Sequence, residues 1–71
     1  TGNEDVRLTR REKEIIKKIA EDLSNQEIAD ELFISLRTVE THRRNLMQKL
    51  KLKSVVSLLK YAAQHNIIDL T

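Results

Sequence analysis

Residues 24–44 of the chain read SNQEIADELFISLRTVETHRR, a stretch that contains two helix-start patterns eleven residues apart. At the first, Ser24 can accept a hydrogen bond from the backbone N–H of Glu27, whose carboxylate can reach back to the Ser24 N–H in a capping box. Ser35 repeats the N-cap. A helix therefore begins just after each serine, and the chain must turn between the two helices. This arrangement predicts a helix-turn-helix.

Two further helices flank this pair. Another capping box, formed by Thr9 and Glu12, precedes apolar residues at helical spacing and predicts a helix over Arg10–Asp22. The second helix of the pair is expected to span Leu36–Leu50, and a fourth helix to span roughly Val55–His65. There is no proline and one glycine, so only caps and charged residues interrupt the chain. The sequence predicts an all-α fold of four helices.

Length and composition limit the function. With 71 residues, 39% of them hydrophobic, the chain makes one domain with a small core. It contains no nucleophile–base pair and no phosphate loop, so we expect no enzymatic activity and no cofactor. The absence of cysteine excludes disulfides and thiolate metal sites and suits a reducing cytoplasm. No apolar run is long enough for a membrane span or a secretory signal.

The ends of the chain differ in character from its middle. Residues 1–7 are polar and lack a periodic pattern, so we interpret them as a linker from an upstream segment or a cloning remnant. Residues 8–71 are predicted to form the helix-turn-helix domain. Near its end, Asn66 follows the fourth helix at a position that needs the left-handed conformation, which asparagine tolerates better than most residues.

Charge is distributed unevenly along the chain. Residues 1–35 hold six Lys and Arg against nine Asp and Glu, a net charge of −3. Residues 36–60 hold seven Lys and Arg against Glu40 alone, a net charge of +6. The positive charge therefore begins with the second helix of the pair, where a polyanion such as double-stranded DNA would bind.

The second helix of the pair has one apolar and one polar side. At about 100° per residue, Val39, Leu46 and Leu50 fall on one side, which is expected to be buried. The opposite side can enter the major groove of DNA and reach base edges. Our candidates for base contacts are Arg37, Glu40, Thr41 and Arg44. Candidates for phosphate contacts, which fix register without reading sequence, are Ser24, Asn25, Thr38, Arg43, Asn45 and Lys49.

Two residues of this helix allow other interpretations. Glu40 can accept from cytosine N4, or it can pair with Arg43 or Arg44 along the same helix. His42 lies at the edge of the apolar side and is interpreted as a packing residue. No cluster of histidines and carboxylates with ligand spacing accompanies it, so we predict no metal site.

These motifs resemble the LuxR-type (FixJ/NarL-like) DNA-binding domain. The resemblance runs from about Leu8 to Ile68 and rests on LTRRE at residues 8–12, SNQEIA at 24–29, LFIS at 32–35, TVETH at 38–42 and KL at 49–50. It implies a four-helix module whose third helix enters the major groove and whose fourth helix mediates dimerisation. It also implies the C-terminal effector domain of a bacterial transcriptional regulator, most often a two-component response regulator with an upstream receiver domain.

The fourth helix carries more apolar surface than a small bundle needs. Val55, Leu58 and Ala62 form one stripe, which is expected to pack on the core. A second stripe beside it suggests a partner surface, and the resemblance implies that the partner is an identical copy on an inverted-repeat operator. The predicted dimerisation residues are Val56, Leu59 and Ala63.

Two other functions remain compatible with the sequence. A sigma-factor region-4-like module shares the helix-turn-helix and would occupy a promoter through RNA polymerase, which is also a candidate partner of a regulator. A helical protein-interaction module would use the same helices to bind another protein. The TVETH motif and the apolar fourth helix favour the transcriptional regulator.

Overall fold

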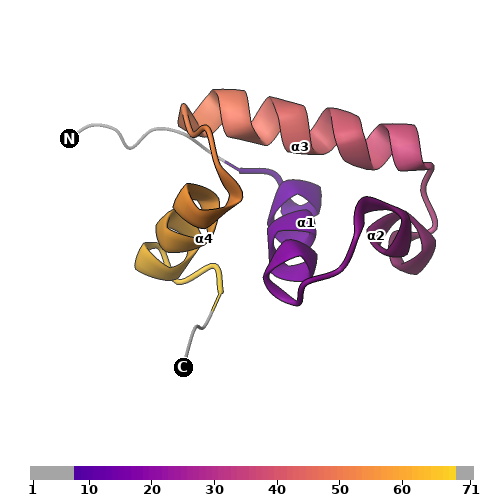
Figure 1. Cartoon of the computed structure of the whole chain (residues 1–71), viewed down its shortest axis with the longest axis horizontal. Helices are drawn as coiled ribbons and strands as arrows, with labels where there is room; N and C mark the ends of the chain where they lie inside the picture. Colours follow the sequence, from indigo (N-terminus) through magenta and orange to yellow (C-terminus); the bar gives the residue numbers. More distant parts are fainter. Residues whose placement is uncertain (1–7, 69–71) are drawn as a thin grey trace.

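A computed structural model of the chain describes residues 8–68, in which there are four helices and no strand. They are α1 (Arg10–Ala20), α2 (Asn25–Leu32), α3 (Leu36–Leu50) and α4 (Val55–Gln64). In Figure 1, α3 runs along the top of the view, over α1 and α2, while α4 lies on the other side of α1 from α2. Helix α1 packs against each of the other three helices. The predicted all-α fold is confirmed.

Every helix begins at a side-chain cap. Thr9 and Ser24 head complete capping boxes, with Glu12 and Glu27 as the reciprocal partners. The Oγ of Ser35 accepts from the Thr38 N–H at 3.0 Å, and Ser54 caps α4 in the same manner. These bonds satisfy backbone donors that the first turn of a helix leaves without partners. The four predicted helix starts are confirmed.

Every helix also ends in the same way, at a residue in the left-handed conformation. The N–H of the following residue then donates to the carbonyl five positions back, as in a Schellman motif, and its apolar side chain packs against the core. The left-handed residues are Asp22, Phe33, Lys51 and Asn66.

The expected left-handed conformation of Asn66 is confirmed, with φ of 59°. The predicted ends of the first and fourth helices were wrong by two residues and one residue. Helix α1 stops at Ala20 because the Leu23 N–H turns back to the Lys18 carbonyl, at 3.3 Å, and the intervening residues leave the helix. Helix α4 stops at Gln64.

A small apolar core fixes the orientation of α3. The buried hydrophobic residues are Ile15, Ile16, Ile19, Ile28, Ala29, Val39, Leu46, Leu58 and Ala62. Val39 and Leu46 belong to α3 and are fully buried, while Leu50 is partly buried against the core. The predicted apolar side of α3 thus faces the core, so its polar side faces solvent along the whole helix.

Candidate nucleic-acid interface

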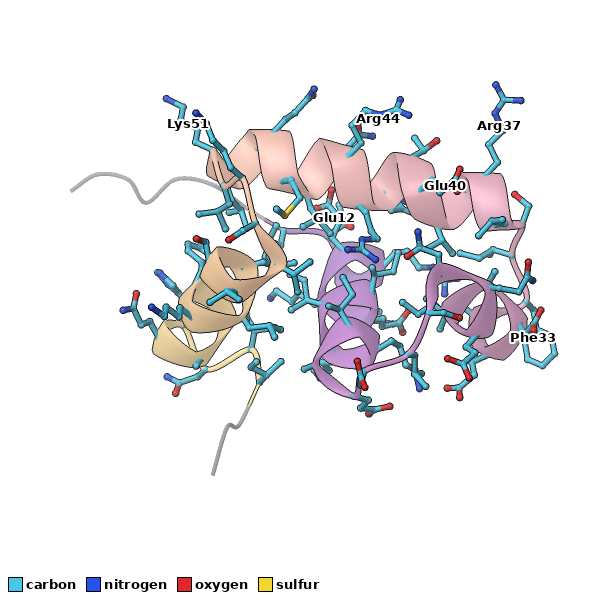
Figure 2. The ribbon with its side chains drawn as sticks, viewed as in Figure 1. Glu12, Phe33, Arg37, Glu40, Arg44 and Lys51 are labelled. Atoms are coloured by element: carbon cyan, nitrogen blue, oxygen red, sulfur yellow. The ribbon has the colours of Figure 1, made fainter. Side chains whose placement is uncertain are left out.

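The polar side of α3 forms an open hollow near the N-terminus of the helix. The four candidates for base contacts are all exposed and all line it, together with Ser35 and Leu36. Figure 2 shows Arg37 and Arg44 projecting from α3 on the side away from α1 and α2. The four candidates contribute two guanidinium groups, one carboxylate and one hydroxyl, a set of groups that matches the donors and acceptors of base edges in the major groove.

Glu40 lies among these groups without an ion pair. The ion pairs formed within residues 8–68 are Arg11–Glu14, Lys18–Glu31 and Lys49–Glu12. Arg43, one of the two arginines considered as its partner, instead donates to Asn25. The Glu40 carboxylate is therefore presented to solvent inside the hollow, an arrangement that favours base contact over pairing along the helix.

A second group of polar residues joins α2 to α3. The Nη1 of Arg43 lies 2.5 Å from the Oδ1 of Asn25, and both side chains are half-buried. Next to this pair, the Ser24 N–H donates to Glu27 Oε1 at 2.8 Å and closes the capping box. The structure thus brings three of the phosphate candidates together at the N-terminus of α2, where backbone N–H groups and the helix dipole favour an anion.

The other phosphate candidates lie along the opposite edge of α3. At about 100° per residue, Thr38, Asn45 and Lys49 fall within about 40° of one another, on the far side of the hollow from Arg43. The Thr38 hydroxyl is hydrogen-bonded to Ser35 Oγ at 2.8 Å, and Asn45 is exposed. The base candidates are therefore flanked by polar residues on both sides, as a helix between two phosphate backbones would be.

Lys49 has a structural contact that the sequence did not predict. Its Nζ lies 2.8 Å from Glu12 Oε1, which also accepts the Thr9 N–H at 2.9 Å. Burial of Glu12 raises the pKa of its carboxyl group, but the hydrogen bonds from Lys49 and Thr9 outweigh burial, and the pKa lies below its ordinary value. Glu12 was interpreted only as a capping residue, because its distant partner leaves no local signal.

Neither histidine lies in a metal site. His42 is half-buried at the edge of the core, as expected, and His65 stacks on Tyr61 with ring centroids 4.1 Å apart. Between residues 8 and 68 there is no group of three His, Cys, Asp or Glu side chains that could hold a metal ion. Over the same range, no helix is long and apolar enough to span a bilayer.

The second apolar stripe of α4 is only partly exposed. Val56 is 64% exposed, whereas Leu59 and Ala63 are half-buried and Leu59 packs against the core. Of the first stripe, Leu58 and Ala62 are buried as expected, but Val55 is exposed. The exposed apolar surface of α4 is therefore concentrated in its first turn.

The fold and this surface define a helix-turn-helix DNA-binding domain. Residues 6–62 match the model of the bacterial regulatory proteins of the luxR family, and the chain belongs to that family. The family binds DNA and is not enzymatic, in agreement with the prediction from length and motifs.

Individual relatives extend this result. The chain is 47% identical over 62 residues to the oxygen regulatory protein NreC of Staphylococcus carnosus, covering 87% of this chain and 29% of that protein. It is 37% identical to the Fimbriae Z protein of Salmonella typhimurium, over 94% of this chain and 32% of that protein. The crystal structure of the response regulator ChrA of a heme-sensing two-component system is similar with a TM-score of 0.80 and 32% identity, over 96% of this chain and 33% of ChrA. The chain spans about a third of the length of these proteins.

Proposed function

We propose that this domain binds specific operator sequences in double-stranded DNA, as the effector domain of a two-component response regulator in the bacterial cytoplasm. The similarity to ChrA, a response regulator, supports the regulatory context. The similarity to NreC, an oxygen regulatory protein, agrees with it. Membership of the luxR family favours a regulator over a sigma-factor module.

The observation that carries the proposal is the hollow on the outer side of α3. Four of the polar side chains that line it come from two successive turns of α3, and the burial of Val39 and Leu46 directs them away from the core. With α3 in the major groove, Arg37 and Arg44 donate to guanine O6 and N7, Glu40 accepts from cytosine N4, and Thr41 contacts a base edge or a thymine methyl.

Phosphate contacts on both sides of the groove would hold α3 in register. On one side, Ser24, Asn25 and Arg43 bind one strand through side chains and the N-terminus of α2. On the other side, the proposed contacts are Thr38, Asn45 and Lys49. Because the Arg43 guanidinium is already bonded to Asn25, it is positioned before DNA arrives, which reduces the entropy lost on binding.

We further propose that two copies bind an inverted repeat through α4, with Val56 at the centre of the contact and Leu59 and Ala63 beside it. A two-fold axis between the copies would set the half-sites about one helical turn of DNA apart. RNA polymerase is the proposed protein partner of the DNA-bound dimer.

Selection of binding sites from a random duplex library tests the proposal. We expect one preferred sequence, and Arg44→Ala should weaken binding to it by about 1–3 kcal/mol while relaxing the preference at one base pair. Lys17→Ala is the matched control, since it removes a positive charge from the exposed side of α1 and should leave the preference unchanged. An equal loss on selected and random DNA would remove Arg44 from the base contacts.

The salt dependence of binding separates DNA recognition from a protein-interaction function. If a dimer makes about 6–10 phosphate contacts, its affinity for the selected site should fall about 10³–10⁵-fold between about 50 and 200 mM salt. A domain that shows no DNA binding at low salt would contradict the proposal and favour a module that binds another protein.

A further inference from the structure

Leu36 is an apolar residue within the otherwise polar hollow of α3. Its side chain is 38% exposed, and it lines the hollow with the four proposed base contacts. The other exposed large hydrophobic residues of the described chain, Phe33, Val55 and Val56, are not part of this lining. Leu36 therefore presents apolar surface at the place where base edges are proposed to bind.

The position of Leu36 on α3 is well defined. It is the first residue of the helix, directly after the Ser35 cap, and the Val39 N–H donates to the Ser35 carbonyl at 3.1 Å. Leu36, Glu40 and Arg44 are spaced four residues apart and form one ridge along the helix. The N-terminal residues of a helix in the major groove are the ones that contact base edges, so Leu36 begins a ridge that continues into the proposed base contacts.

The chemistry of leucine limits what it can recognise there. An isobutyl group has no donor or acceptor, so it cannot bond to a phosphate or to the polar atoms of a base. The C5-methyl group of thymine is the apolar group that the four standard bases display in the major groove. Contact between the two removes apolar surface from water on both sides.

We infer that Leu36 is a further specificity-determining residue, which packs against the methyl group of a thymine beside the base pairs that Glu40 and Arg44 read. The inference rests on the proposed function, because it requires α3 in the major groove. It adds one thymine to each half-site of the operator. It also assigns that base to an apolar contact, whereas the other proposed contacts are polar.

Replacement of single thymines by deoxyuridine tests the inference, because uracil lacks only the methyl group. In the selected site, the change should weaken binding of the unmodified domain about fourfold at one thymine per half-site, the value expected for one buried methyl. With Leu36→Ala, the same replacement should have no effect. Leu36→Met, which keeps an apolar side chain of similar reach, should retain the sensitivity.

Thr41→Ala is the matched control within the hollow, because threonine also carries a methyl group that can contact thymine. It should abolish the sensitivity at a different thymine or at none. Lys17→Ala, on the exposed side of α1, should leave the whole pattern unchanged. Circular dichroism of each variant checks that the fold is kept, and alanine is the best helix former, so Leu36→Ala should preserve α3.

Each outcome decides the inference. The inference is overturned if Leu36→Ala stays sensitive to deoxyuridine at every thymine at which the unmodified domain is sensitive. It is also overturned if Leu36→Ala weakens binding to selected and random DNA equally. A variant with unchanged DNA affinity would overturn it too, and would indicate that Leu36 contacts a protein partner instead. In those cases a preference that depends on Arg44 would still support the proposed function. If selection yields no preferred sequence, the proposed function and the inference fail together.

Discussion

Lys49 and Glu12 join the C-terminal end of α3 to the N-terminal end of α1. Their Nζ and Oε1 atoms are 2.8 Å apart, and the side chain of Glu12 is 6% exposed while that of Lys49 is 34% exposed. The same oxygen accepts the Thr9 N–H, so one buried carboxylate caps α1 and also holds α3. A carboxylate in such a position stabilises the crossing of the two helices as long as it stays ionised and bonded.

Glu12→Gln should lower the free energy of unfolding by about 1–3 kcal/mol, because the glutamine amide has the shape of the carboxylate but lacks the negative charge to which the Lys49 ammonium bonds. Urea denaturation followed by circular dichroism measures the change. The matched control is Glu14→Gln, which breaks the exposed Arg11–Glu14 pair and should cost no more than about 0.5 kcal/mol. Equal losses for the two variants would contradict a special role of Glu12.

The stability of the domain should depend on the ionisation of Glu12. Its pKa in the folded domain is lowered, chiefly by Lys49 and Thr9 acting against burial, from an ordinary value of about 4.3. A group whose pKa is lowered by folding stabilises the folded domain while it is ionised. This stabilisation is lost as the pH falls through the folded-state pKa. Between about pH 5 and 3, the free energy of unfolding should therefore fall more steeply with decreasing pH for the unmodified domain than for Glu12→Gln. If the free energy of unfolding has the same pH dependence in both proteins, the proposed contribution of ionised Glu12 to stability is contradicted.

Lys49→Ala should distinguish a phosphate contact from a purely structural role. Loss of the contact with Glu12 predicts reduced stability in urea. Loss of a phosphate contact predicts weaker binding to all sequences. It also predicts that the salt slope, the slope of log affinity against log salt concentration, becomes smaller in magnitude by about one. Glu12→Gln is the control, because it disturbs the same pair without removing a positive charge from α3. If both variants keep the salt slope of the unmodified domain, Lys49 does not contact phosphate.

Phe33→Gly should stabilise the domain although it removes an aromatic side chain. Phe33 has φ of 58° and is 94% exposed, so it strains the backbone while burying almost no surface. Glycine adopts this conformation without the steric cost, which is about 1–2 kcal/mol for other residues. Lys51→Gly, at the same φ in the turn after α3, should act in the same direction, whereas Gln48→Gly inside α3 should cost about 1 kcal/mol. If neither Phe33→Gly nor Lys51→Gly raises the urea midpoint of unfolding, the backbone strain proposed for these turns is contradicted.

Val56→Glu should abolish cooperative binding to a paired site while leaving the affinity for a single half-site unchanged. Val56 is the most exposed member of the proposed dimer surface, whereas Leu59 packs partly on the core and its replacement would also disturb the fold. The matched control is Val55→Glu, which makes the same change in the same turn of α4 on a neighbouring face. Gel-shift titrations with one and two half-sites measure both quantities. Unchanged cooperativity in Val56→Glu would refute the assignment.

Local sequence was sufficient for the helix starts and for the outward side of α3. A cap such as Ser24 or Ser35 bonds to a residue three positions away, so the relevant atoms are neighbours in the chain. The side of α3 that faces solvent follows from the positions of Val39 and Leu46, because an apolar stripe at helical spacing is buried and its opposite is not. The resemblance to the LuxR-type domain had the same basis in short local motifs.

Contacts between distant segments required the tertiary structure. The Lys49–Glu12 and Arg43–Asn25 contacts join residues 37 and 18 positions apart, and periodicity does not show which side chain of another helix lies opposite a given residue. For the same reason, the sequence placed Val55 in a core stripe that the structure exposes, and it did not identify Leu36 as part of the hollow. Periodicity gives the direction of a side chain around its own helix axis, but its surroundings depend on how the helices cross, which the packing of the whole core decides.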